Sequence, residues 1–147
     1  MPEGSTEGQI AFVLTADTLS QEKDGTIGGK PENLQDAIDK IRRARAGMRT
    51  GTAFCLDRRI WAGGQWQVEQ RIEQYVEAEY IFDIPEAWID RYIAHTIALS
   101  ASQAIAIEEY GAQFLKEVRG SYSTIVGLPL FEVREALEKV GFLGPLS

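Results

Sequence analysis

Cysteine and histidine are almost absent from this chain. Its 147 residues include one cysteine, Cys55, and one histidine, His95. A single thiol excludes a disulfide within the chain and a cysteine-based zinc site, and a single imidazole excludes a multi-histidine metal site. No apolar run approaches the length of about 18 residues that a membrane span requires, and the acidic, polar start is unlike a signal peptide. We therefore expect a cytoplasmic protein with no membrane partner.

Positive charge is also in deficit. Lys and Arg number 15 against 22 Asp and Glu, so the net charge is −7. Non-specific binding to nucleic acid needs a basic surface, so we expect no nucleic-acid polymer as a partner. A local cationic pocket for a small anion stays compatible with this balance. Hydrophobic residues make up 44% of the chain, which is enough for a core and excludes a disordered polypeptide.

Short apolar runs alternate with turn signals along the chain. Strands are expected at residues 9–15, 26–29, 50–56, 60–64, 104–107 and 112–118, with a turn at 57–59 and a loop at 120–123. A helix is expected from Pro31 to Gly47, and a last helix over residues 133–140. This mixture predicts an α/β or α+β fold, with a central mixed sheet and flanking helices. We expect residues 1–8 to be a loose end and residues 9–147 to form one domain.

Residues 65–82 fit two secondary structures. Val68, Ile72 and Val76 fit one helical face, but apolar residues of even number recur as far as Phe82, as a long strand requires. The abundance of Val, Ile, Tyr and Phe favours the strand. The following Asp83–Glu86 has the spacing of a capping box and predicts the start of another helix.

Two positions carry residue types that suit phosphate chemistry. Asp17 follows the first apolar run, so we expect a carboxylate at the tip of a buried strand, where it could hold a cation or activate water. Lys30 precedes Pro31 at a helix start, where an ammonium group would favour an anion. On spacing alone, an aspartate bonded to the next turn and a solvated lysine are the more ordinary interpretations.

Five motifs occur in an order that points to one family. The first four are Ala16-Asp17-Thr18, Asp24-Gly25, Gly29-Lys30-Pro31 and Thr50-Gly51. Residues 120–130 then read G-S-Y-S-T-I-V-G-L-P-L, which is similar to the G-S-Y-S-N-V-V-G-L-P-L signature of the Maf-like nucleotide pyrophosphatases. Over residues 9–143 the chain resembles that family, and the long run near its end is the most specific part of the resemblance.

The resemblance implies an activity, a fold and a set of site residues. Members of the family hydrolyse nucleoside triphosphates to the monophosphate and pyrophosphate with a divalent cation, Mg²⁺ or Mn²⁺, in a cleft between two lobes. By similarity Asp17 is the catalytic base and the metal-associated residue, and Lys30 contacts the phosphates. Thr18 and Glu108 match two positions associated with base selection. The implied partner is a nucleoside triphosphate, and assembly into a homodimer is left open.

The chain departs from the family pattern in three places. It has no Ser-x-Ser-Pro-Arg-Arg segment, Ala101 stands where a lysine is expected, and Glu108 stands where one subfamily has glutamine. Thr18 is typical of the pyrimidine-specific type and Glu108 of the 7-methyl-GTP type. We expect a shortened domain with impaired catalysis. The alternatives are a non-catalytic nucleotide-binding or protein-interaction module that keeps the fold, and a scaffold whose exposed sheet edge pairs with another chain.

Overall fold

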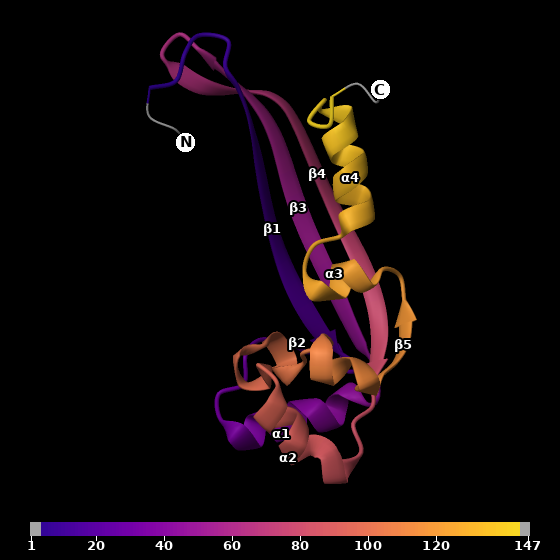
Figure 1. Ribbon diagram of the computed structural model, residues 1–147. Coiled ribbons are helices and arrows are strands. Elements are labelled where there is room, and N and C mark those ends of the chain that lie inside the picture. Colours follow the sequence, from indigo (N-terminus) through magenta and orange to yellow (C-terminus); the bar gives the residue numbers. More distant parts are fainter. Residues whose placement is uncertain (1–3, 145–147) are drawn as a thin grey trace.

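The computed structural model describes residues 4–144 and contains one five-stranded sheet with helices on it (Figure 1). The strands lie in the order β2-β1-β3-β4-β5. They are β1 (Ile10–Glu22), β2 (Ile27–Gly28), β3 (Met48–Ala62), β4 (Gln65–Phe82) and β5 (Leu115–Arg119). The helices are α1 (Leu34–Ala44), α2 (Ile89–His95), α3 (Tyr122–Val126) and α4 (Leu130–Lys139). Four 3₁₀ turns complete the fold: η1 (Glu86–Trp88), η2 (Ala98–Ser100), η3 (Ser102–Ala104) and η4 (Glu109–Phe114).

The expected α/β architecture is confirmed, but the sheet is not mixed. All four strand pairings among the described residues are antiparallel. Figure 1 shows β1, β3 and β4 as three long strands side by side, with α1 and α2 gathered at one end and α3 and α4 along the strands. No helix in residues 4–144 is long and apolar enough to cross a membrane.

One face of the long strands carries two separate cores. Side chains alternate between the faces of a strand, and the even-numbered residues of β3 from Met48 to Leu56 are buried. Phe54 and Leu56 pack with Val133 and Val140 around α4. The larger cluster lies at the other end, where Ile41, Phe82, Ile84 and Tyr92 are among the fully buried members. The two cores give the domain two lobes.

The opposite face of the long strands is exposed. The odd-numbered side chains Asp17 on β1, Ala53 on β3 and Glu73 on β4 are open to solvent. Leu19 and Tyr75 belong to the same face and are 55% and 60% exposed. Antiparallel sheets commonly bury one face and leave the other in water, and this sheet follows that pattern.

The turn expected at residues 57–59 is wrong, because β3 runs without a break through these residues. Asp57 has a nearly buried side chain, and its carboxylate forms ion pairs of 2.7 Å with both Arg59 and Arg71. Hydrogen bonds from Arg71 lower the pKa of Asp57 far below its usual value, and Arg59 adds to the effect. These ion pairs compensate the buried charge of Asp57, so the strand continues through the polar residues. A β-bulge between Arg58 and Arg59 shifts the register with β4 at this point.

The tip expected for the first strand is also misplaced. β1 continues past residue 15 to Glu22, which pairs with Met48, so Asp17 lies within the strand opposite Ala53. The apolar run ends early because the buried side of the second half of β1 is polar. Ser20 and Glu22 are buried there, and Glu22 forms an ion pair of 2.7 Å with Arg43.

The strand expected at residues 104–107 does not form. The segment begins at the last residue of η3 and pairs with no strand of the described chain. Tyr92 bonds to two of its backbone groups instead. The Tyr92 hydroxyl donates to the Ala104 carbonyl at 2.9 Å and accepts from the Ala106 N–H at 2.7 Å. One buried side chain therefore replaces the ladder that the apolar run alone suggested.

Other boundaries differ in detail. Residues 65–82 form the strand that parity favoured, whereas the stretch from residue 112 joins its strand only at Leu115. The loop expected at residues 120–123 instead begins α3, which Ser121 caps through its hydroxyl. The Asp83–Glu86 capping box is not formed, since the chain enters η1 at Pro85 without a side-chain cap. Within the expected loose end, residues 1–3 lie outside the described part of the structure, and the Gly8 N–H donates to the Trp61 carbonyl.

Candidate functional site

Asp17 lies in a shallow groove on the exposed face of the sheet. The groove encloses about 510 Å³, and its lining comes from β1, β3 and β4: Thr15, Ala16, Asp17, Ala53, Phe54, Cys55, Glu73, Gln74 and Tyr75. The Asp17 carboxylate accepts one hydrogen bond, from the Thr18 N–H at 3.0 Å. No Lys, Arg or His of the described chain forms an ion pair with it, so the carboxylate keeps free lone pairs toward solvent.

Thr18 faces the other side of the sheet. Its hydroxyl lies 2.8 Å from the Thr52 hydroxyl and donates weakly to the Gly127 carbonyl at 3.4 Å. Thr52 also donates to the Thr124 carbonyl at 3.2 Å. Successive side chains of a strand point to opposite faces, so the structure separates the Asp17 carboxylate from the Thr18 hydroxyl. Thr18 instead joins β1 to the 120–130 run.

Lys30 is exposed in the loop between β2 and α1, and Gln103 packs against the glycines before it. The Gln103 N–H donates to the Gly29 carbonyl at 2.8 Å. A Cβ added to Gly28 would lie 1.9 Å from Gln103 Nε2, so a larger residue there would displace the Gln103 side chain. Gln103 has a φ of 57° and is 1% exposed, and both polar atoms of its carboxamide lack a hydrogen-bond partner. A left-handed backbone and a buried carboxamide without partners both lower the stability of the fold. Residues with such features cluster at functional sites.

The contact between Gly28 and Gln103 predicts a graded response to added volume. We expect Gly28→Ala to lower the free energy of unfolding by about 1–3 kcal/mol, because the new methyl group displaces a buried side chain. Gly28→Ala combined with Gln103→Gly should recover most of that loss. Urea denaturation measures both changes.

Gly29→Ala is the matched control for this pair of variants, because a Cβ at Gly29 meets no atom within 4 Å. It should leave stability within about 0.5 kcal/mol of the parent chain. Equal destabilisation by the two single substitutions would show that Gln103 does not restrict this loop.

Glu108 is exposed and lies beside the 120–130 run. Tyr122 donates to the carbonyl of the preceding residue, Ile107, at 3.3 Å. Burial, and secondly the charge of Glu108, raise the pKa of Tyr122. Residues 103–107 thus contact Gly29, just before Lys30, and also contact Tyr122 of the 120–130 run. The same run contacts Thr18 through Gly127. In the described structure no hydrogen bond or ion pair joins the side chains of Asp17, Lys30 and Glu108 to one another.

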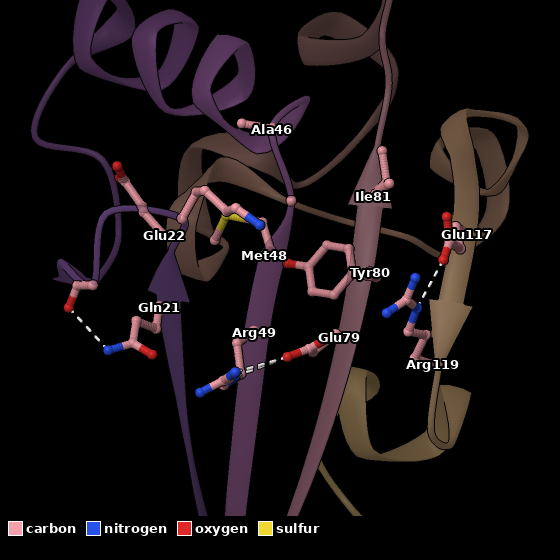
Figure 2. A pocket seen from close by; sticks show the side chains of 13 residues that line it. Gln21, Glu22, Ala46, Met48, Arg49, Glu79, Tyr80, Ile81, Glu117 and Arg119 are labelled. Atoms are coloured by element: carbon pink, nitrogen blue, oxygen red, sulfur yellow. Dashed lines mark hydrogen bonds and ion pairs between the residues drawn. The ribbon is translucent and has the colours of Figure 1, made fainter.

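A second cavity lies where β1, β3, β4 and β5 meet, as Figure 2 shows, and encloses about 300 Å³. Asp17, Thr18, Lys30 and Glu108 do not line it, whereas Gly25 of the Asp24-Gly25 motif does. Its arginines are already matched by carboxylates, since Arg49 lies 2.8 Å from Glu79 and Arg119 lies 2.9 Å from Glu117. Two of the three basic residues of the lining are thus neutralised, and Lys23 is the third. Such a lining suits a triphosphate poorly. Sequence reasoning missed this cavity, because it arises from strand register.

The groove offers an incomplete set of metal ligands. Residues 4–144 contain no group of three or more Asp, Glu, His or Cys side chains that could hold a metal ion. Magnesium is usually bound by one or two carboxylates together with water and substrate phosphates. Asp17 therefore fits as one ligand of an ion that arrives with a nucleotide. Burial raises the pKa of the Cys55 thiol, which makes that groove residue a poor ligand and a poor nucleophile.

The fold and the groove together define an α/β protein with two lobes and an unpaired carboxylate on the open side of a long antiparallel sheet. The model of the Maf-like protein family matches residues 3–140, so the chain belongs to that family.

Curated relatives agree with this assignment. A dTTP/UTP pyrophosphatase of Anaeromyxobacter dehalogenans (strain 2CP-1) is 38% identical over 134 residues, which is 89% of this chain and 66% of the relative. A dTTP/UTP pyrophosphatase of Syntrophus aciditrophicus is 34% identical over 135 residues, or 90% of this chain and 62% of the relative. A nucleoside triphosphate pyrophosphatase of Saccharopolyspora erythraea is 32% identical over 145 residues, or 96% and 66%. The chain thus spans slightly less than two thirds of these relatives.

Proposed function

We propose that this chain binds nucleoside triphosphates and hydrolyses them to the monophosphate and pyrophosphate. The unpaired Asp17 carboxylate in an open groove carries the proposal. Membership of the Maf-like family and relatives named as pyrophosphatases support it. A carboxylate with free lone pairs is the group that this reaction needs, because a water molecule must lose a proton as it attacks phosphorus.

The proposed reaction has a simple balance of atoms. Asp17 accepts a proton from water, and the water oxygen forms a bond to the α-phosphorus. The bond from that phosphorus to the oxygen bridging to the β-phosphorus breaks, and pyrophosphate leaves with the bonding electrons. Lys30 supplies a positive point charge for the phosphates, and Glu108 faces the base. Thr18 lies on the other face of β1 from Asp17, bonded to Thr52, and its part in base selection would be indirect. A divalent cation held partly by Asp17 would offset the charge of the triphosphate.

We expect slow turnover from this 147-residue chain. Catalysis of phosphoryl transfer is mainly positioning and charge stabilisation, and the loss of one preorganised donor typically costs a factor of about 10²–10³ in rate. Lys30 is the one cation assigned to the phosphates here, and Ala101 replaces another. The alternative function is a nucleotide-binding module without catalysis.

One assay separates the two functions. Pyrophosphate release is measured with dTTP, UTP and 7-methyl-GTP at saturating Mg²⁺ or Mn²⁺, and calorimetry follows the binding of the same nucleotides. Release that requires Asp17 supports the enzyme, and turnover above roughly 1 s⁻¹ contradicts the proposed impairment. Binding without release favours the non-catalytic module. Neither binding nor release overturns both.

Glu108 predicts the order of base preference. A carboxylate accepts hydrogen bonds from the two neighbouring donors of a guanine edge, whereas thymine and uracil present two acceptors around one donor. We expect tighter binding of guanine-type nucleotides than of dTTP or UTP, and Glu108→Gln should reverse the order by about tenfold. Calorimetry on both chains measures this. Several relatives are named dTTP/UTP pyrophosphatases, and this chain could share their preference. If the unsubstituted chain binds dTTP more tightly than guanine-type nucleotides, Glu108 does not face the base.

A further inference from the structure

Two glycines and a proline surround Lys30, and they give its backbone opposite tendencies. Gly28 and Gly29 precede it, and glycine has the greatest backbone freedom of all residues. Pro31 follows it, which has a fixed φ and keeps the preceding residue away from helical geometry. The position of Lys30 in the lysine loop, residues 28–30, therefore depends on what restrains the two glycines.

Gln103 restrains both glycines from a distant part of the sequence. Its N–H donates to the Gly29 carbonyl at 2.8 Å, and Figure 1 shows the segment after α2 returning toward β2. Its carboxamide lies against Gly28, since the three atoms nearest to a Cβ added there all belong to that group. Gly28 also pairs with Ser20 of β1. The lysine loop is thus held between the sheet and Gln103.

Gln103 is an unfavourable residue for the place that it occupies. Its φ of 57° and ψ of 19° are left-handed, a conformation that residues other than glycine rarely adopt. Its side chain is buried, yet neither polar atom of its carboxamide has a hydrogen-bond partner in the described chain. Both features lower stability, and an observed outlier of this kind is a physical reason to look for a function.

The segment that begins at Gln103 also leads to Glu108, and hydrogen bonds fix it along its length. The Tyr92 hydroxyl bonds to two backbone groups of residues 104–106, at 2.9 and 2.7 Å. Tyr122 donates at 3.3 Å to the carbonyl of the residue just before Glu108. One restrained segment therefore connects the lysine loop to the residue assigned to the base.

We propose that Gln103 is a positioning residue, which holds the lysine loop in one conformation so that Lys30 meets the phosphates of a nucleotide whose base lies at Glu108. This inference rests on the proposed function, which assigns the phosphates to Lys30. An ordered loop loses little conformational entropy when a ligand binds, whereas a mobile loop of two glycines and a lysine loses more. Gln103 acts through Lys30 and needs no contact with the nucleotide.

Gln103→Gly separates positioning from stability. Glycine adopts the left-handed conformation without strain, and the buried carboxamide is removed, so the urea midpoint should stay at or above that of the unsubstituted chain. The lysine loop loses its restraint, so affinity for a nucleoside triphosphate at saturating Mg²⁺ should fall about tenfold in calorimetry. Unchanged affinity overturns the proposal. A lower urea midpoint with a parallel loss of affinity also overturns it, because Gln103 would then serve the fold alone.

Ala104→Gly is the matched control for this variant. Ala104 is buried and has the same φ of 57° as Gln103. The control thus places an equally flexible glycine in the same turn but keeps the Gln103 side chain. Its affinity for the triphosphate should equal that of the unsubstituted chain. A loss as large as that of Gln103→Gly would assign the effect to the flexibility of the turn and contradict the proposal.

A double-mutant cycle with Lys30→Ala tests whether Gln103 acts through the lysine. Once the ammonium group is removed, Gln103→Gly should cause no further loss of triphosphate affinity, since the two residues serve one interaction. Equal losses with and without Lys30 would show that the effects are independent, and the proposed route through Lys30 would be wrong.

Nuclear magnetic relaxation of ¹⁵N tests the restraint without a nucleotide. The order parameters of Gly29 and Lys30 should be about 0.85, as in a rigid backbone, and should fall below about 0.6 in Gln103→Gly but not in Ala104→Gly. A mobile loop in the unsubstituted chain, or no change on substitution, overturns the inference. If the order parameters change as expected but no nucleotide binds, the proposed function fails, and with it the role of Gln103 in binding, while the restraint on the loop is confirmed.

Discussion

Asp17→Asn should lower pyrophosphate release by a factor of about 10²–10⁴, the usual contribution of a general base. The amide has nearly the same shape as the carboxylate but does not accept a proton from water. The fold should survive, because Asp17 is exposed and the amide oxygen still accepts from the Thr18 N–H. The measurement is release from the preferred nucleotide at saturating metal, beside a urea denaturation curve for the variant.

Glu73→Gln is the matched control for Asp17→Asn. Glu73 is an exposed carboxylate on β4 that lines the same groove, and it has no assigned role in the reaction. This variant should keep its turnover. Undiminished release by Asp17→Asn would remove Asp17 from the reaction, and equal losses in the two variants would point to the charge of the groove instead.

Tyr92→Phe should lower the free energy of unfolding by about 2–4 kcal/mol. The Tyr92 side chain is fully buried, and its hydroxyl satisfies the Ala104 carbonyl and the Ala106 N–H. Phenylalanine fills the same space but leaves both backbone groups without partners, and each such group costs about 1–3 kcal/mol. Urea denaturation at neutral pH measures the loss.

Tyr75→Phe serves as the comparison for Tyr92→Phe. Tyr75 is 60% exposed, and its hydroxyl donates to Glu77 at the surface. Water replaces that bond, so stability should change by less than about 0.5 kcal/mol. If Tyr92→Phe were equally mild, the segment before Glu108 would depend on other contacts than the Tyr92 hydroxyl.

Segment 104–107 illustrates how a correct local pattern led to a wrong element. Four apolar residues in a row are typical of a buried strand, and these residues are indeed buried or half-buried. The pattern reports burial but not the partner of the backbone. That partner, Tyr92, comes from another element, and nothing in the spacing of the run identifies it.

β3 shows the same limit in a polar stretch. Asp57, Arg58 and Arg59 read as a turn, because three charged residues rarely lie within a buried strand. The strand continues because Arg71 on β4 reaches Asp57 in register. That pairing depends on where two strands align, and alignment is decided by the whole sheet.

The sequence alone determined the elements whose evidence is local and periodic, and the family. The even-numbered apolar residues of 65–82 favoured a long strand, which the structure confirms, and the ordered motifs from Ala16 to Leu130 carried the resemblance that the family match confirms. Only the tertiary structure decided which residues meet. It placed Asp17 and Thr18 on opposite faces of β1 and packed Gln103 against Gly28. The physical reason is that periodicity records how each residue relates to solvent, whereas contacts between distant segments depend on register and packing.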